Sequence, residues 1–256
     1  FKNRKYWFNC NPDNPNHWFY TEWILQPEKH NAYHLHFLME DNPALDDETI
    51  KEASLMYSGV FYDRYILGKW VVAEGRVYPQ FDPAIHIIEH NKIPTSNLHY
   101  VSIDYGTLNP CSMGLWRIVN GKAYRVKEYY HSGRETQTQL TDEEYYQALE
   151  KLTDGYKIDC IVIDPSAASF IACIRKHGKY NVRPAINDVI DGIRVTSTFL
   201  YQKKLFFSED CPNTINEFTL YRWDDKAGED KVIKENDHAM DDTRYFCKTI
   251  LERYLR

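Results

Sequence analysis

The chain has 256 residues, which is enough for one large domain or two small ones with a real hydrophobic core. Hydrophobic residues make up 43% and charged residues 27% of it, a balance that excludes a disordered chain. The sequence also lacks an apolar run of about 18 residues, the signal of a membrane-spanning helix. The formal net charge of −6 excludes a generic polybasic nucleic-acid-binding protein, but it leaves room for a basic patch beside an acidic metal site.

The first 70 residues are rich in Asn, Pro and aromatic side chains. They predict a short helix at 21–25, a strand at 34–39 and a helix from Asp46 to about residue 57 that Gly59 ends. Further strands are expected at 71–72 and 76–81.

The central part of the chain predicts a sheet. Residues 98–105 form an apolar strand with one acid near its end. Two more strand-like runs flank Asn120-Gly121, which is the strongest short signal for a β-hairpin with a type I′ turn. A capping box that starts at Thr141 predicts a helix to about residue 152, and 158–164 is a buried strand that again ends in an acid.

Helices dominate the rest of the sequence. They are expected at 166–177, ending at Gly178, at 188–202, at 212–223 and at 237–256, with a short strand at 205–208 and a polar hairpin within 224–236. This order of elements predicts an α/β fold in which helices cover a mixed sheet.

Three acids occupy unusual positions. Asp104 and Asp164 each close an apolar strand, and Asp241 follows His238 by three residues in the opening turns of the last helix. Strand-end acids can meet at one edge of a sheet, and clustered carboxylates repel unless a cation joins them. Oxygen ligands suit Mg²⁺ or Mn²⁺, and two such ions suit the hydrolysis of a phosphodiester.

Ordinary structural roles would explain the same residues. A strand-end Asp often caps a turn or a helix, Asp241 or equally Asp242 could favour the helix N-terminus, and His238 could be an ordinary first-turn histidine. The spacing alone leaves both interpretations open.

Three motifs occur in a familiar order: SIDYGTLNP at 102–110, VIDPSA at 162–167 and DHAMDDTRY at 237–245. Together they resemble the C-terminal nuclease domain of the large terminase subunit of tailed bacteriophages, of the PBSX-like prophage type. The resemblance implies a ribonuclease H-like fold. It also implies that Asp104, Asp164 and Asp241 are metal ligands for two Mg²⁺ or Mn²⁺ ions, with His238 as an accessory catalytic group.

The N-terminal part resembles the end of the terminase ATPase domain, through residues 7–18, 41–45 and 59–70. The resemblance implies that residues 1–70 are the C-terminal remnant of that domain with its linker, and that 71–256 form the nuclease domain. The chain opens on Phe1 rather than Met, so we expect a fragment or a processed product. It contains no GxxxxGK[ST] motif, and ATP is therefore not expected to bind it.

The function implied is endonucleolytic cleavage of concatemeric double-stranded viral DNA during genome packaging, with little sequence specificity. The expected partners are DNA, the small terminase subunit and the portal protein, with no membrane, in the host cell cytoplasm. Six scattered cysteines without CxxC or zinc-finger spacing agree with a reducing compartment. Candidate DNA-binding residues are Arg175, Lys176, Lys179, Arg183, Lys203, Lys204, Lys226, Lys231 and Lys234.

Two other functions fit the same sequence. One is a non-enzymatic module of the packaging motor that grips DNA and docks on the portal. The other is a different ribonuclease H-like enzyme, such as a junction resolvase or a transposase.

Overall fold

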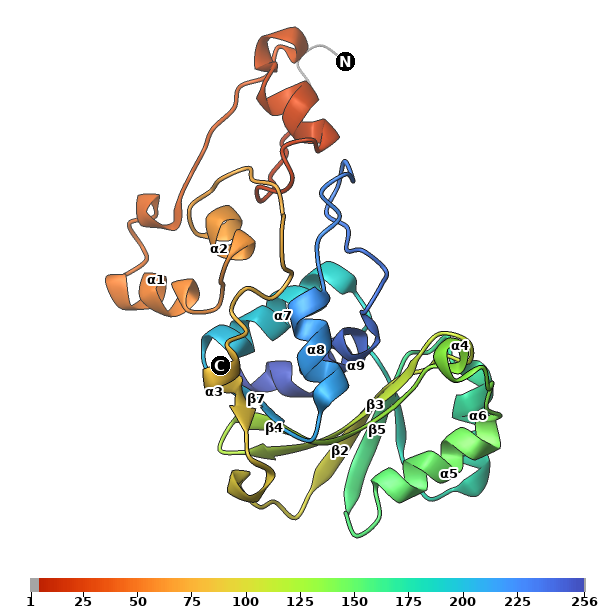
Figure 1. The fold of residues 1–256 in the computed structure, drawn as a ribbon. Helices are drawn as coiled ribbons and strands as arrows, with labels where there is room; N and C mark the ends of the chain where they lie inside the picture. Colours follow the sequence, from red (N-terminus) through yellow and green to blue (C-terminus); the bar gives the residue numbers. More distant parts are fainter. Residues whose placement is uncertain (1–4, 256) are drawn as a thin grey trace. The chain divides into compact units, whose positions relative to one another are not determined.

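The computed structural model describes residues 5–255 (Figure 1). The chain divides into two compact units. One unit contains the chain up to Gly75 together with Asp224–Lys231, and the other contains the remainder. No helix of the described chain has the length and apolar character needed to cross a membrane.

The first unit is built from two helices and short helical turns. The helices are α1 (Asp47–Ser54) and α2 (Val60–Tyr65), and the turns are Tyr20–Ile24, Pro27–His30 and Met39–Asp41. Asp46 caps α1 by accepting a hydrogen bond from the Thr49 amide. The predicted helix at 46–57 thus ends at Ser54, and Gly59 precedes α2 instead of closing α1.

Two strands predicted in this unit are absent. Residues 34–38 and 71–72 are irregular, because no neighbouring strand completes a hydrogen-bonded ladder with them. Alternating apolar residues predict which face a strand would bury, but they do not supply its partner.

Arg64 joins the two parts of the first unit, the N-terminal part of the chain and the segment Asp224–Lys231. Its guanidinium is 1% exposed and donates to Oδ1 of Asp13 at 2.9 Å and to Oδ1 of Asp230 at 3.1 Å. The amide of Asp224 donates to the carbonyl of Lys231, and this closes the hairpin expected within 224–236. The hairpin is therefore tied by a buried ion pair to a residue 166 positions away in the sequence.

The second unit contains a seven-stranded sheet with the order β1-β7-β4-β3-β2-β5-β6 (Figure 1). Strands β2, β3 and β4 are antiparallel neighbours, and the other pairs are parallel. The strands are β1 (Ile87–Ile88), β2 (His99–Asp104), β3 (Cys111–Val119), β4 (Lys122–His131), β5 (Ile158–Ile163), β6 (Val182–Pro184) and β7 (Leu205–Ser208). The prediction of a strand at 76–81 is wrong, because only Arg76 forms an isolated β-bridge in this range. The short strands β1 and β6 were not predicted.

The hairpin between β3 and β4 confirms the turn signal. Asn120 and Gly121 have φ angles of 51° and 72°, and a type I′ turn needs positive φ at both of its central residues. Asn tolerates the left-handed region better than most residues, and Gly enters it without a steric penalty.

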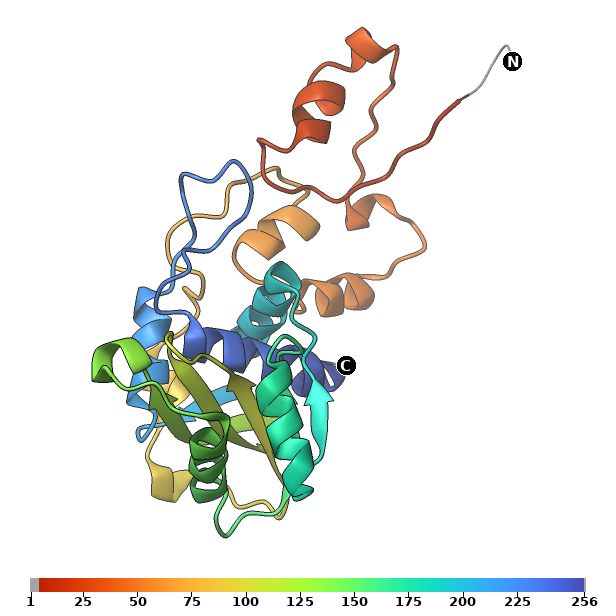
Figure 2. The ribbon, with the colours of Figure 1, turned by 90° about the vertical axis from the view of Figure 1, so that its right-hand side faces the viewer.

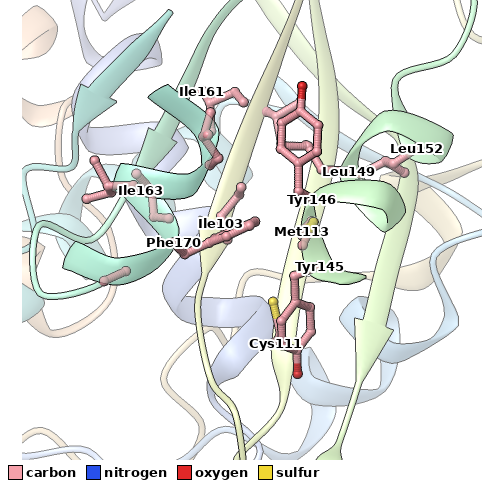
Figure 3. Packing of buried hydrophobic residues seen from close by; sticks show 14 of the residues in the cluster. Ile103, Cys111, Met113, Tyr145, Tyr146, Leu149, Leu152, Ile161, Ile163 and Phe170 are labelled. Atoms are coloured by element: carbon pink, nitrogen blue, oxygen red, sulfur yellow. The ribbon is translucent and has the colours of Figure 1, made fainter. Parts of the chain in front are cut away.

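Helices cover both faces of the sheet, as the order of elements predicts (Figures 1 and 2). On one face lie α5 (Asp142–Leu152) and α6 (Ala168–His177), over the buried side chains drawn in Figure 3. On the other lie α7 (Val189–Tyr201), α8 (Pro212–Leu220) and α9 (His238–Phe246). The short helices α3 (Pro83–His86) and α4 (Gly133–Thr136) complete the unit.

The last helix is shorter than predicted. It ends as an α-helix at Phe246 and continues as a π-helical turn, Cys247–Leu251, and a 3₁₀ turn, Glu252–Tyr254. Residue 256, the predicted end of this helix, lies outside the described residues.

Candidate metal centre

Two of the predicted acids leave the sheet at the same edge. Strands β2 and β5 are parallel neighbours in which Ile103 pairs with Ile163. Asp104 is the last residue of β2, and Asp164 is the residue that follows β5. The strand register therefore places the two acids next to each other at the carboxyl ends of these strands.

Helix α9 packs against β2 and β3 and brings His238 to Asp104. Nδ1 of His238 lies 2.9 Å from Oδ2 of Asp104. Burial raises the pKa of Asp104 to about 6; the hydrogen bond from His238 opposes this shift, and the charge of Asp241 adds to it. Burial disfavours the charged form of His238, but the hydrogen bond and charge of Asp104, together with the charges of Asp237 and Glu217, outweigh burial and raise the pKa of His238.

Asp241 is held by two cationic side chains. Oδ1 accepts from Nη2 of Arg244 at 2.8 Å, and Oδ2 accepts from Nζ of Lys234 at 3.3 Å. Arg244 also donates to the carbonyls of Asn187 and Asp188, so its guanidinium is fixed from three directions. Lys234 has a side chain that is 60% exposed, and it can release Asp241 without disturbing the core.

Asp164 has donors of its own. It accepts from the amide of Ser166 at 2.7 Å, from Nδ2 of Asn187 at 2.9 Å and from the hydroxyl of Tyr245 at 3.2 Å. Burial opposes its ionisation, but these hydrogen bonds lower the pKa of Asp164 below its ordinary value. The Ser166 bond is also the turn-capping role that the sequence left open for a strand-end Asp.

Asp242, the neighbour of Asp241, faces the middle of the sheet. It is fully buried against Arg125 of β4, whose Nη2 donates to Oδ2 at 3.0 Å, and it accepts from the hydroxyls of Ser102 and Ser112. This ion pair ties α9 to the middle of the sheet. Asp242 is thus engaged in the core, and Asp241 is the acid that α9 presents near Asp104.

The three predicted acids share this edge, but they do not touch. Tyr245 is near all of them: burial raises its pKa, and the charges of Asp104, Asp241 and Asp164 raise it further. Within residues 5–255, however, the three carboxylates are not a group whose ligand atoms all lie within 4.8 Å of one another. The donor set consists of oxygen atoms alone, which fits Mg²⁺ or Mn²⁺.

The comparisons with known proteins find homologues among phage large terminases. No family model matches the sequence. The large terminase of a thermophilic bacteriophage, in complex with ATP-gamma-S, is 45% identical and superposes with a TM-score of 0.93 over 98% of this chain and 64% of that one. The chain is homologous to phage large terminases. The large terminase subunit of Escherichia phage T5 is also similar, with 25% identity over 231 residues, 84% of this chain and 51% of that protein.

This terminase homologue therefore spans between about half and two thirds of the length of these relatives. Its fold also matches a nuclease domain solved by itself. The large terminase nuclease of the thermophilic phage G20c, with bound cobalt, superposes with a TM-score of 0.51 at 10% identity, over 69% of this chain and 97% of that one. The predicted ribonuclease H-like fold of the terminase nucleases is confirmed.

One candidate functional residue of this terminase homologue, Glu217, was not predicted from the sequence. Glu217 of α8 accepts hydrogen bonds from the amides of Ala239 at 2.7 Å and Met240 at 3.2 Å, and so caps the helix that carries His238 and Asp241. The hydroxyl of Tyr130 donates to its other oxygen at 2.7 Å. No local pattern marks Glu217, because the amides that it caps lie 22 and 23 residues further along the chain and Tyr130 lies 87 residues before it.

Tyr245, Asn187 and Arg244 were also missed as residues that hold the acids. Tyr245 and Arg244 stand inside the motif at 237–245, so a signal existed for these two. Asn187 precedes α7 and carries no such signal.

The predicted basic residues lie on separate elements. Arg175 and Lys176 are in the last turn of α6, and Arg175 lines a surface hollow with Pro165, the residue after Asp164. Several others have acidic partners, Lys179 with Glu150 at 2.9 Å among them. Arg183 lies in β6, Lys203 and Lys204 lie between α7 and β7, Lys226 and Lys231 belong to the first unit, and Lys234 contacts Asp237 and Asp241.

Proposed function

We propose that the second unit is a metal-dependent endonuclease that cuts concatemeric double-stranded viral DNA during genome packaging, with little sequence specificity. The observation that carries this proposal is the shared edge of β2 and β5, where Asp104 and Asp164 stand side by side and His238 of α9 bonds to Asp104. Homology to phage large terminases supports the role in packaging.

The proposed ligands are Asp104, Asp164 and Asp241. The G20c nuclease, which shares the fold, binds cobalt, and this supports a divalent cation here. The raised pKa of Asp104 also fits, because a dication would offset the cost of a buried carboxylate near a second acid. Two bound Mg²⁺ or Mn²⁺ ions would ready a water molecule for attack and stabilise the leaving 3′ oxygen.

The chain's own side chains keep these ligands in place. His238 orients the Asp104 carboxylate, Asn187 and Tyr245 orient Asp164, and Arg244 orients Asp241. Arg175, in the hollow beside Pro165, is the basic candidate that we assign to a DNA phosphate next to Asp164.

The proposal extends to the rest of the motor. Residues 1–70 would correspond to the C-terminal part of the packaging ATPase domain, and we do not expect ATP to bind this chain, because it contains no GxxxxGK[ST] motif. The partners are the small terminase subunit and the portal protein, in the host cell cytoplasm.

Plasmid nicking tests the proposal. The chain is incubated with supercoiled DNA and Mn²⁺ or Mg²⁺, and Asp104→Asn is compared with the parent. We expect the substitution to lower the cleavage rate by about 100-fold or more, equivalent to ~2.7 kcal/mol of transition-state stabilisation. Asp159→Asn is the matched control, because Asp159 is an exposed acid near the other end of β5.

Equal rates in the parent and Asp104→Asn would end the nuclease proposal. If calorimetry also detects no divalent cation bound at millimolar concentration, the chain is a DNA-gripping or portal-docking module. A strong preference for branched DNA or transposon ends would indicate a resolvase or a transposase.

A further inference from the structure

A second cluster of ligand-type side chains lies on the outer surface of the helices opposite α9. Glu143 is in the first turn of α5, and Cys173 and His177 lie one turn apart on α6. Among the described residues, 5–255, they are the one group of three His, Cys, Asp or Glu side chains whose ligand atoms all lie within 4.8 Å of one another. None of them belongs to the candidate metal centre.

Two of the three separations between ligand atoms are close to the edges of a tetrahedron, and the third, between Sγ of Cys173 and Nε2 of His177, is within 4.8 Å. Nε2 of His177 lies 3.0 Å and 3.1 Å from the two oxygens of Glu143, and Sγ of Cys173 lies 3.7 Å from Oε2. With Zn–S bonds of about 2.3 Å and Zn–N or Zn–O bonds of about 2.0–2.1 Å, a tetrahedral ion separates N and O ligands by about 3.3 Å, and S and O ligands by about 3.5 Å. The N–O and S–O pairs therefore need to move by only a few tenths of an ångström to bind one ion.

The surrounding residues hold the ligands in position. The ring of Tyr146 stacks on His177 with centroids 3.8 Å apart and planes 8° apart, which fixes the plane of the imidazole. Tyr146 is itself buried in the core beneath α5 and α6 (Figure 3). The capping box of Thr141 and Glu144 fixes the first turn of α5, where Glu143 lies. Two ligands four residues apart on one helix face the same side, as metal sites on helices require.

An exposed ion pair between His177 and Glu143 would account for two of the three residues. It does not account for the thiol, which points at the same carboxylate and is partly buried. A zinc-class ion would bind the sulfur as a thiolate, so metal binding would displace the thiol proton.

We propose that Glu143, Cys173 and His177 bind a zinc-class ion with three protein ligands, a fourth position open to water, and α5 clamped to α6. A thiolate, an imidazole and a carboxylate select Zn²⁺ or Co²⁺ over Mg²⁺, so this site differs in chemistry from the all-oxygen centre at Asp104. The site does not depend on the proposed nuclease function.

Cobalt titration tests the site in this chain, stripped of metal by a chelator. We expect one equivalent of Co²⁺ to produce a near-ultraviolet thiolate-to-cobalt band that Zn²⁺ abolishes and Mg²⁺ does not. Cys173→Ser removes the band, and the matched control Cys10→Ser keeps it, because Cys10 is an exposed cysteine of the first unit. Asp104→Asn also keeps it, which separates this site from the candidate metal centre.

A second variant guards against misfolding of Cys173→Ser. Glu143→Gln keeps the thiol and removes one proposed metal ligand. We expect it to weaken Co²⁺ binding by about tenfold or more, because losing even a residue that only hydrogen-bonds to a metal ligand lowers metal affinity by ~10–100-fold. We also expect Zn²⁺ to raise the melting temperature of the parent and not that of Cys173→Ser. A parent without the band, or a band of equal strength and affinity in both variants, would overturn the proposal.

Discussion

Nδ1 of His238 lies 2.9 Å from Oδ2 of Asp104, although 134 positions separate the two residues in the sequence. The contact joins the first turn of α9 to the end of β2. Strand β2 fixes the backbone of Asp104, and His238 of α9 holds one carboxylate oxygen, Oδ2, by a hydrogen bond. The remaining oxygen positions are left for other ligands.

His238→Ala tests what this contact contributes. We expect the cleavage rate to fall by about 10- to 100-fold, the usual effect of losing a partner that orients a metal ligand. The measurement is the rate of plasmid nicking at saturating Mn²⁺, and His238→Gln, which retains one hydrogen-bonding group, should recover part of it. A completely inert His238→Ala protein that still binds metal would mean that the imidazole takes part in the chemistry itself.

Asp164→Asn should abolish cleavage without unfolding the protein. The amide of Ser166 can still donate to the remaining oxygen of Asn, so the turn after β5 stays capped. The melting temperature of the metal-free variant should lie slightly below that of the parent, because the donors around Asp164 stabilise its ionised form. A fall of many degrees would show that Asp164 is mainly a structural residue.

Asp241 and Asp242 are adjacent, but they should respond differently to the same substitution. Asp242→Asn leaves Arg125 buried without its ion-pair partner, and breaking such a pair costs ~3–5 kcal/mol of unfolding free energy. Asp241→Asn also removes the ion-pair partner of a buried arginine, Arg244, but it should cost less stability, because Arg244 keeps its bonds to two backbone carbonyls, and it should abolish cleavage. Urea denaturation and nicking assays on both variants measure the contrast, and equal losses of stability would contradict it.

The parts of the fold that the sequence predicted correctly have strong local signals. Asn120-Gly121 marks its own turn, and Thr141 with Glu144 marks the start of α5, because the deciding contacts lie within a few residues. The strand expected at 34–39 failed for the opposite reason, since a strand needs a partner that the local pattern does not contain.

The candidate site could be predicted only in part. The strand-end positions of Asp104 and Asp164 were visible in the sequence, and the strand register brings them together. Which of Asp241 and Asp242 faces the edge depends on Arg125, a charged residue within β4 whose burial no pattern indicates. The cluster of Glu143, Cys173 and His177 was hidden because its members come from two helices, so their spacing in the sequence matches no metal motif.

The cap of α9 gives a prediction about pH. Burial raises the pKa of Glu217 from its ordinary value of 4.5 to about 7, and the bonds from Tyr130 and the amides of Ala239 and Met240 oppose the shift only partly. The folded state therefore holds one more proton than the unfolded chain between these two values. The stability that this group contributes is complete below about pH 4.5 and is lost as the pH rises through about 7.

Glu217→Gln should flatten this dependence. Between pH 4.5 and pH 8, ionisation of Glu217 should lower the unfolding free energy of the parent by at most about 3 kcal/mol. The variant carries no ionisable group at this position and should not show this decrease. Urea denaturation of the metal-free proteins across this range measures the slope. Glu128→Gln is the matched control, because Glu128 likewise caps a helix, α8, through the amides of Asn213 and Thr214, but is only partly buried. If the slopes of the parent and Glu217→Gln coincide, the carboxylate of Glu217 is already ionised when it caps α9, and the three hydrogen bonds outweigh its burial.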